Sequence, residues 1–340
     1  MSILSKIIVA VVTLIAVLVV VGFFLPRDVH VEREIVIDAP QATVFALVNG
    51  YSRFNEWSPW AAKDPDTRYV YEGPTHGVGA IQSWESDDRN VGSGRQEIVA
   101  STPHEEVRTA LDFGDQGTAD ALFRLSPIDG GTRVVWGFDS DMGTNPIGRY
   151  IGLFMDGMLG PDYESGLGNL KALAESLPKD DFADLDAEVV TVEPANVAYI
   201  TRTTSQDAGE IAAALGESYG AILGFLAGEG AQMAGAPISI HQSWEGDTYT
   251  FDAGMPFVGD LGELAEDAPV QVRETHGGKA LKVVHLGSYH LLGETYDKAE
   301  AYIEAHGWEL AGPAWDAYVD DPTTKPEAEV ATHCYFPLAD

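Results

Sequence analysis

Ser218, at the centre of Gly216-Glu-Ser-Tyr-Gly220, is the first residue whose setting suggests chemistry. The spacing fits the G-x-S-x-G pattern of hydrolase nucleophiles, which expose a serine on a sharp turn from a strand into a helix. Here the pattern lies inside a stretch of helical periodicity, from Ile211 to Ala227, so Ser218 has no such turn. We interpret the match as a coincidence of spacing.

The histidines and the single cysteine do not form a predicted metal site. His333 and Cys334 are adjacent on a predicted strand, where neighbouring side chains point to opposite faces and cannot chelate one ion. The other histidines, such as His285 and His290, lack paired ligand spacing. A single cysteine also excludes an intramolecular disulfide. We predict no metal and no other cofactor.

Large aromatic side chains are the candidates for binding an apolar ligand in the first half of the chain. Four of the seven tryptophans lie there, at Trp57, Trp60, Trp84 and Trp136. Such side chains can line a pocket of lipid size, but they also dominate ordinary hydrophobic cores. Both interpretations stay open for each of the four.

The elements that would position functional side chains repeat in the C-terminal half. Two passes of strand, helix, strand and strand follow one another. The first covers residues 196–202, 211–227, 238–244 and 249–257, and the second covers 280–286, 291–306, 314–319 and 330–337. A unit of this size cannot bury its apolar face alone. We therefore expect the two copies to share one interior, with a ligand cavity at the seam.

The segment 29–178 predicts a compact α+β domain. A strand at 31–38 leads into a helix that ends near Val48, with Asp38 as its expected N-cap. Six strand-like runs follow, at 68–72, 80–86, 94–101, 106–113, 119–125 and 132–139. Helical periodicity returns from 146 to 177, where we expect Pro161 to separate a short helix from a longer one. A curved antiparallel sheet around the last helix would leave a cavity between them.

Four short motifs in this segment carry a family resemblance. They are Ile35-Val-Ile-Asp-Ala-Pro40, Trp57-Ser-Pro-Trp60 with Asp64, Gly77-Val-Gly-Ala80 with Trp84, and Gly131-Thr-Arg-Val-Val-Trp136. Together they resemble the START-like (SRPBCC) superfamily of polyketide cyclases and lipid-transport proteins. The resemblance implies a helix-grip fold for an apolar ligand. It does not specify an activity, because the superfamily includes carriers, receptors and cyclases.

The repeated half carries a second resemblance. Its motifs are His285-Leu-Gly-Ser-Tyr289, Gly312-Pro313, Trp315-Asp-Ala-Tyr-Val-Asp-Asp-Pro322 and Thr332-His-Cys-Tyr-Phe-Pro-Leu338. They are similar to the GyrI-like, or bacterial effector-binding, family, which also supplies the drug-sensing half of some transcription regulators. We expect this domain over 188–340, after a short acidic linker at 179–187.

The GyrI-like resemblance implies a ligand cavity with a central carboxylate. In the family, a glutamate on the strand after the second helix attracts cationic aromatic ligands, and in some members it is implicated in hydrolysis. The matching residue here is Asp316, which is one methylene shorter. Desolvation in an apolar cavity would suit it as a general base, so it is also the candidate catalytic residue. Tyr289 and Trp315 resemble aromatic wall residues of that cavity, with core packing as the alternative for each, and Tyr318 is a further candidate. His241 and Trp244 are candidates by pseudo-symmetry, because they lie on the equivalent strand of the first copy.

Residues 7–25 form an apolar run without a charge and predict a membrane anchor within residues 1–28. Nineteen helical residues span about 28 Å, close to the hydrocarbon thickness of a bilayer. The run ends in Gly22-Phe-Phe-Leu-Pro-Arg27 without a small-residue cleavage pattern, which favours an uncleaved helix. Lys6 on one side and Arg27 and Arg33 on the other nearly balance. The short N-terminal tail favours a periplasmic body.

The chain is strongly acidic, with 20 Lys and Arg against 53 Asp and Glu and a net charge of −33. Such a field repels phosphate backbones, and the basic footprint of a nucleic-acid-binding protein is missing. We therefore exclude nucleic acid as a partner. Solubility is the simplest reason for the acidity, and attraction of a cationic ligand is the alternative.

These features predict a membrane-anchored binder of hydrophobic or amphipathic small molecules that captures, senses or sequesters them. One alternative is a hydrolase that uses Asp316 as base or nucleophile in the second cavity. Another is an adaptor for a different membrane protein, which predicts an exposed apolar patch and filled interiors. Loss of turnover in Asp316→Asn would favour the enzyme, and ligand binding without turnover would favour the binder.

Overall fold

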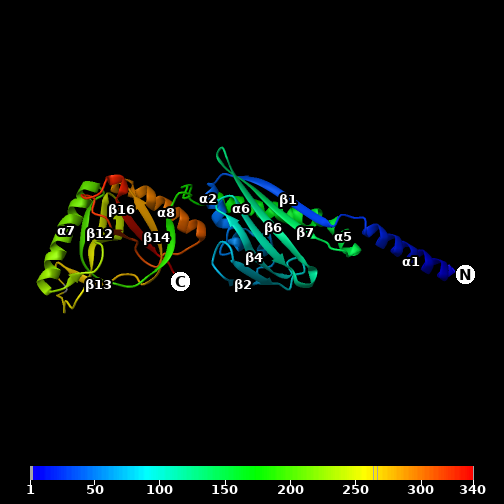
Figure 1. Cartoon of the computed structure of the whole chain (residues 1–340), viewed down its shortest axis with the longest axis horizontal. Coiled ribbons are helices and arrows are strands. Elements are labelled where there is room, and N and C mark those ends of the chain that lie inside the picture. The colour runs from blue at the N-terminus through cyan, green and yellow to red at the C-terminus, as the bar shows by residue number, and fades with distance from the viewer. Residues whose placement is uncertain (1–2, 263, 266, 340) are drawn as a thin grey trace. The chain divides into compact units, whose positions relative to one another are not determined.

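The computed structural model describes residues 3–262, 264–265 and 267–339. The chain forms two compact units and passes from the first to the second between Ala183 and Asp184 (Figure 1). Each unit mixes helices with a curled antiparallel sheet, as the sequence predicts.

The first unit contains an apolar N-terminal helix and a seven-stranded antiparallel sheet. Its helices are α1 (Ile3–Gly22), α2 (Gln41–Val48), α3 (Phe54–Trp57), α4 (Pro59–Lys63), α5 (Pro146–Gly152) and α6 (Met155–Ser176). Its strands are β1 (Asp28–Ile37), β2 (Arg68–Glu72), β3 (Ile81–Glu85), β4 (Ser93–Thr102), β5 (Glu106–Asp112), β6 (Thr118–Ile128) and β7 (Gly131–Asp141). The strand order is β1-β7-β6-β5-β4-β3-β2, which is the predicted meander with β1 closing one edge.

Helix α6 packs on the sheet through an aromatic core. The ring of Tyr163 stacks on Trp136 with centroids 3.9 Å apart. Gly166 makes this packing possible, because a Cβ there would lie 2.8 Å from the Trp136 ring and 2.9 Å from Pro59. Leu167 and Leu170 continue the buried side of the helix. This arrangement matches a helix gripped by a curved sheet.

Two local predictions for this unit are wrong. The helical break lies at Leu153 and Phe154, between α5 and α6, and Pro161 lies within α6. Pro161 has no backbone N–H and so removes the hydrogen bond to the carbonyl of Gly157, yet the helix continues through it. Asp38 does not cap α2, whose N-cap residue is Pro40 and which has no side-chain cap.

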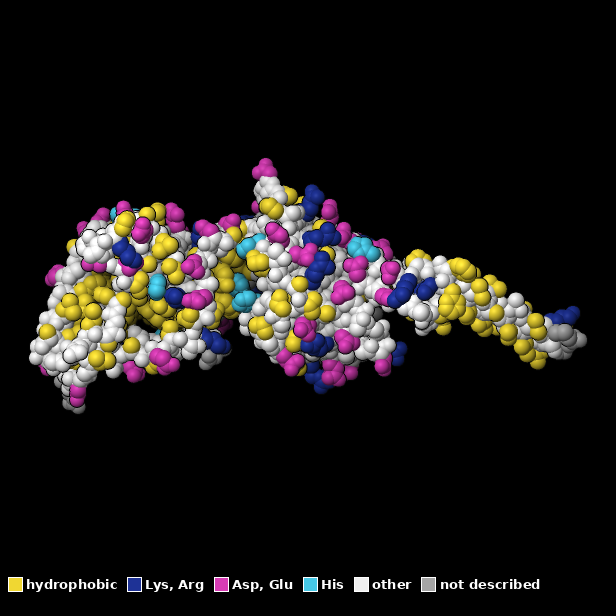
Figure 2. All heavy atoms as spheres, in the orientation of Figure 1, with side chains coloured by type: hydrophobic (Ala, Val, Ile, Leu, Met, Phe, Trp, Pro, Cys, Tyr) yellow, Lys and Arg dark blue, Asp and Glu magenta, His cyan; other side chains and the backbone are white. Residues whose placement is uncertain are grey.

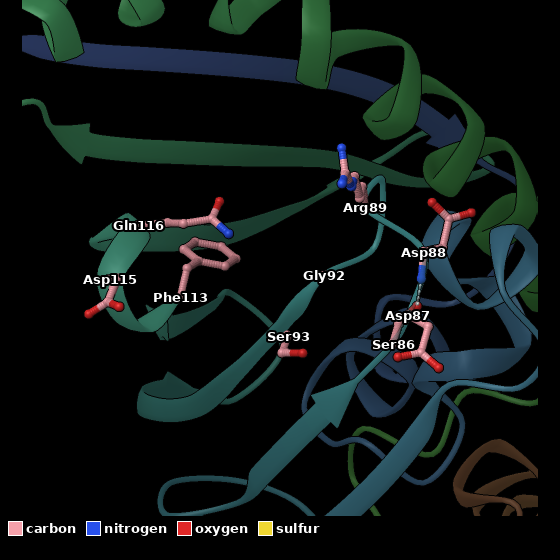
Figure 3. A pocket seen from close by; sticks show the side chains of 9 residues that line it. All are labelled: Ser86, Asp87, Asp88, Arg89, Gly92, Ser93, Phe113, Asp115 and Gln116. Carbon is pink, nitrogen blue, oxygen red and sulfur yellow. Dashed lines mark hydrogen bonds between the residues drawn. The ribbon is translucent and has the colours of Figure 1, made fainter.

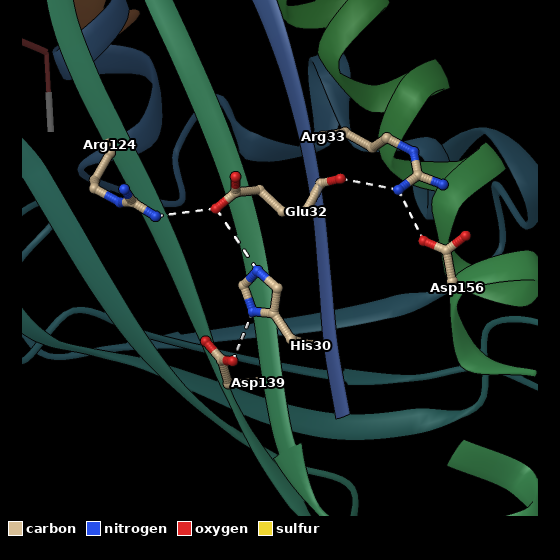
Figure 4. A network of polar contacts seen from close by, with 6 residues as sticks. All are labelled: His30, Glu32, Arg33, Arg124, Asp139 and Asp156. Carbon is tan, nitrogen blue, oxygen red and sulfur yellow. Dashed lines mark hydrogen bonds and ion pairs between the residues drawn. The ribbon is translucent and has the colours of Figure 1, made fainter. Parts of the chain in front are cut away.

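Polar contacts tie β1 to its neighbours (Figure 4). They join His30 to Asp139, Glu32 to Arg124, and Arg33 to Asp156. Arg33 faces α6 and also bonds Glu164 at 2.8 Å, so it holds the first turns of that helix against the strand. Its two carboxylate partners raise the pKa of the Arg33 guanidinium further. A Cβ at Gly160 would collide with the Arg33 guanidinium, so a larger residue there would displace the guanidinium from this position.

The second unit contains the predicted repeat. Its elements are β8 (Ala187–Val192), β9 (Asn196–Ser205), α7 (Ala208–Glu229), β10 (Gln232–Met233), β11 (Ile238–Glu245), β12 (Thr248–Val258), β13 (Gln271–Glu274), β14 (Gly278–Leu286), α8 (Leu292–His306), β15 (Trp315–Tyr318) and β16 (Ala331–Pro337). The central strand order is β9-β12-β11-β15-β16-β14. The first copy supplies β9-β12-β11, and the second supplies β15-β16-β14, in which the equivalent strands follow in reverse order. The two copies therefore meet at the β11–β15 pair, which we call the seam.

The two faces of this sheet are covered differently. Helix α7 packs on β9 and β12, and apolar residues of α8 join a cluster with β14 and β16. The other face forms its own cluster, in which Val197 of β9 packs with Ala280 of β14. These strands lie far apart in the sheet order, so the sheet curls around that cluster. The helices therefore lie on the opposite face, on either side of the seam.

Candidate functional site

Asp316 lies at the middle of the seam and is 1% exposed. On one side it faces Ser239 of β11, and on the other it faces Cys334 of β16. Residues directly opposite in a sheet share a face, so all three point toward the helices. A carboxylate is seldom buried so completely without partners.

A hydrogen-bond network supplies those partners. Asp316 Oδ1 accepts a bond of 2.8 Å from the hydroxyl of Tyr296 on α8. Its Oδ2 lies 3.2 Å from His241 Nε2, on β11. The other ring nitrogen, His241 Nδ1, lies 2.7 Å from the hydroxyl of Tyr249 on β12. Four elements from both copies thus converge on one carboxylate.

One protonation pattern satisfies the whole network. If His241 is neutral with its proton on Nε2, it donates to Asp316 and accepts the Tyr249 hydroxyl at Nδ1. Tyr296, 2.8 Å from Nε2, then donates its own proton to the carboxylate. In this pattern both ring nitrogens of His241 and both oxygens of Asp316 have hydrogen-bond partners.

A group of tyrosines surrounds the Asp316 side chain. It consists of Tyr219, Tyr249, Tyr296 and Tyr318. Burial raises the pKa of each phenol, and the nearby Asp316 charge raises it further. Burial likewise raises the pKa of the Cys334 thiol. These groups therefore stay protonated at neutral pH and act as hydrogen-bond donors rather than as nucleophiles.

A depression of about 270 Å³ lies at one end of this cluster. It is bounded by the start of α7 at Ala208 and by the turn before α8. Tyr289 lines it, and its ring meets Tyr318 edge-on at 5.6 Å. Tyr318 follows Asp316 by two positions on β15 and so shares its face. Away from this depression, near the middle of the visible side of this unit, Figure 2 shows hydrophobic side chains gathered in a separate hollow.

The structure separates some predicted site residues from Asp316. Trp315 points to the opposite face of β15, where it stacks on Tyr335 with centroids 4.9 Å apart. Trp244 is exposed at the sheet surface and stacks on Tyr249 at 3.8 Å. His241 is in direct contact with Asp316, and Tyr318 shares its face.

Sequence reasoning does not single out Tyr249 or Tyr296 for the site. A signal for Tyr249 exists, because it alternates with Phe251 and Ala253 on the strand beside His241. Nothing in the sequence shows which turn of α8 faces the seam, so Tyr296 needs the fold to be found.

The four tryptophans of the first unit lie in two places. Trp57 and Trp136 are buried in one aromatic cluster, and Trp60 packs at its margin against Trp136 at 5.8 Å. Trp84 lies apart, on β3, edge-on to Phe113. Within the described residues, the indole Nε1 atoms of Trp57 and Trp136 are buried without a hydrogen-bond partner. An unpaired buried donor is rare, and a polar group of a ligand or a water would satisfy it.

An open depression of about 580 Å³ between β3, β4 and the 113–116 segment has Asp88 and Asp115 on its border, and Figure 3 shows them at opposite sides. In the part of the chain that the structure describes, no three His, Cys, Asp or Glu side chains gather as metal ligands. Ser218 lies within α7, where its hydroxyl accepts a bond from Arg202, so it does not form a nucleophile elbow.

Two family models cover most of the chain. Residues 28–175 match the polyketide cyclase / dehydrase and lipid transport family, and residues 186–339 match the GyrI-like small molecule binding domain. The chain therefore carries a polyketide cyclase-like domain followed by a GyrI-like domain, and both resemblances are confirmed in that order. Both descriptions support a small-molecule partner.

Several solved structures resemble part of the chain. The EcmrR–DNA complex has 14% identity over 46% of this chain and 58% of its own, with a TM-score of 0.40. A hydrolase from Listeria innocua has 12% identity over 45% of this chain and 91% of its own, with a TM-score of 0.34. The di-domain ARO/CYC StfQ from the steffimycin biosynthetic pathway has 13% identity over 44% of this chain and 51% of its own, with a TM-score of 0.34. No curated protein matches the chain.

Proposed function

We propose that this chain is a membrane-anchored protein that captures or senses amphipathic small molecules, and that its GyrI-like domain binds cationic aromatic ones beside Asp316. The buried, hydrogen-bonded carboxylate at the seam carries the proposal. A soluble domain that needed only stability would gain as much from an apolar residue there, because burying a charge costs free energy.

The surroundings of Asp316 favour a flat cation over an anion. A positive charge at 4 Å from a carboxylate gains about 4 kcal/mol at an effective dielectric constant of 20, before its own desolvation is subtracted. The rings of Tyr289 and Tyr318 add faces over which a cation is attracted. Tyr289 lines the depression and its ring meets that of Tyr318, so a ligand that moved from the depression toward Asp316 would pass these two rings.

The proposed anchor is α1. It has the length and composition of a membrane-spanning helix, which are also those of a signal sequence. Its apolar side chains are exposed along the whole helix, which is unstable in water but expected in lipid. Helix α7 is also long and apolar enough to span a membrane, but it packs against the sheet of its own domain.

A charge-matched pair of probes tests the binding site. Tetraphenylphosphonium and tetraphenylborate have nearly the same shape and opposite charge. We expect the full chain in detergent to bind the cation more tightly, and Asp316→Asn to weaken that binding by roughly tenfold or more, as 1.4 kcal/mol implies. The borate should bind Asp316→Asn at least as well as the native chain. Equal binding of both ions by the native chain would contradict the proposal.

One observation favours an enzyme as the second candidate. Tyr249, His241 and Asp316 form a hydroxyl–imidazole–carboxylate chain that could move a proton. A hydrolase would lose turnover of a small ester in Asp316→Asn while the folded state persisted. Binding of the cationic probe without any turnover in the native chain would exclude this candidate.

A further inference from the structure

An apolar stripe crosses the junction of α5 and α6, at the end of the first unit where α1 joins it. Ile147, Ile151, Phe154 and Met158 are all more than half exposed, and Phe154 is 67% exposed. Their spacings of four, three and four residues place them on one helical face. The turn between the helices keeps that face continuous, because Phe154 N bonds Ile151 O and Met158 N bonds Phe154 O.

Helix α5 is fixed beside the last turns of α1 (Figure 1). The Tyr150 hydroxyl donates a bond of 2.8 Å to the carbonyl of Leu18. Arg149 donates to the carbonyls of Phe23 and Leu25, just past the C-terminal end of the helix. Gly22 allows the close approach, because a Cβ there would lie 2.7 Å from the Pro146 side chain.

These contacts set the depth of the stripe if α1 spans a bilayer. Leu18 lies four residues before the helix ends, which corresponds to about 6 Å along its axis. The apolar run continues past it to Phe23 and Phe24, which are also exposed. A helix bonded at this level lies at the boundary of headgroups and acyl chains, where amphipathic helices bury their apolar faces and where tyrosine is enriched.

We propose that Ile147, Ile151, Phe154 and Met158 form a docking surface that inserts into the bilayer beside α1. The inference rests on the anchoring role proposed for α1. It commits to lipid rather than to a protein partner, because the stripe continues the exposed apolar surface of α1 at the same depth. The surface would hold the start of α6, and so one end of the helix-grip domain, against the membrane.

Site-specific fluorescence in lipid nanodiscs tests the proposal. The native cysteine, Cys334, is fully buried and its thiol pKa is raised, so a maleimide probe leaves it unlabelled. The variants Phe154→Cys, Val12→Cys and Asp129→Cys, each with one accessible cysteine besides the buried Cys334, would carry an environment-sensitive label. Val12 lies within α1, and Asp129 lies in the exposed turn at the far end of β7. Quenchers would be nitroxide lipids for the membrane and iodide for water.

We expect the label at 154 to be quenched by a nitroxide near the headgroups and protected from iodide, and the label at 129 to show the reverse. Adding Ile151→Gln and Met158→Gln should make the label at 154 accessible to iodide. If the label at position 12 is quenched by nitroxide lipid but the label at 154 is quenched by iodide, the proposed docking surface is wrong while the proposed anchor stands. If 154 is protected from both quenchers, a protein or a second copy covers it, and the lipid assignment is wrong. If 12 is not quenched by lipid, the proposed anchor itself fails.

Discussion

His241 and Asp316 are 75 positions apart in the chain, yet their side chains meet at 3.2 Å across the β11–β15 seam. Each comes from a different copy of the repeat. Asp316 therefore has its full set of partners only when both copies are folded and paired, because Tyr296 comes from its own copy and His241 from the other. Substitutions at the seam should change both the stability of the domain and its ligand binding. Substitutions elsewhere should change one of these properties without the other.

His241→Leu should destabilise the second domain by roughly 1–3 kcal/mol, because it removes a partner of the buried Asp316 and Tyr249. Urea unfolding of the detergent-solubilised chain, followed by circular dichroism, measures this. His290→Gln is the matched control, since His290 is exposed. Equal midpoints for the two variants would show that the network contributes nothing to stability.

Trp315→Leu should lower stability by roughly 1–3 kcal/mol without changing the preference for the cationic probe, because Trp315 stacks on Tyr335 on the face away from Asp316. Thermal unfolding and probe titration on the same sample measure the two effects. A loss of cation preference comparable to that of Asp316→Asn would place Trp315 in the site after all.

Gly166→Ala should destabilise the first domain by about 1–3 kcal/mol, because the new methyl group would collide with Trp136 and Pro59. Gly168→Ala, two residues along the same helix, meets open space and should stabilise it by up to about 1 kcal/mol. Tryptophan fluorescence during denaturation compares them. The same sign for both variants would contradict the packing described for α6.

His333 should make the second domain less stable as the solution is acidified. Burial, with a smaller effect from Lys282, lowers its pKa in the folded chain below the ordinary 6.5. The unfolded chain therefore takes up the proton first as pH falls through 6.5, and stability declines until the folded pKa is passed. Unfolding midpoints at pH 7.5 and 5.0 should differ less in His333→Gln than in the native chain. An unchanged difference would refute this role.

The regular elements are predictable from the sequence because each carries its own periodicity. The meander from Arg68 to Asp141 shows period-two runs between glycine and aspartate turns, and each run became a strand. The repeat is visible for the same reason. The α5–α6 boundary is not predictable in this way, because Pro161 lies inside α6, whereas the break falls at Leu153 and Phe154, which are not helix-breaking residues.

The site is less predictable, since it depends on which faces meet. Alternation along β15 already implies that Trp315 and Asp316 point apart, and only the family resemblance grouped them. By contrast, the bond from Tyr296 to Asp316 joins a helix to a strand 20 residues later, and no local pattern encodes it. Nor does composition show that Trp57 and Trp136 bury unpaired indole nitrogens.

The mirrored strand order of the second domain brings equivalent strands together, but the side chains at their meeting point are not equivalent. Asp316 of β15 lies opposite Ser239 of β11, and the imidazole beside it, His241, comes from β11 alone. A guest bound at this place would meet an acid from one copy and an imidazole from the other, so the two ends of an asymmetric molecule would not be interchangeable.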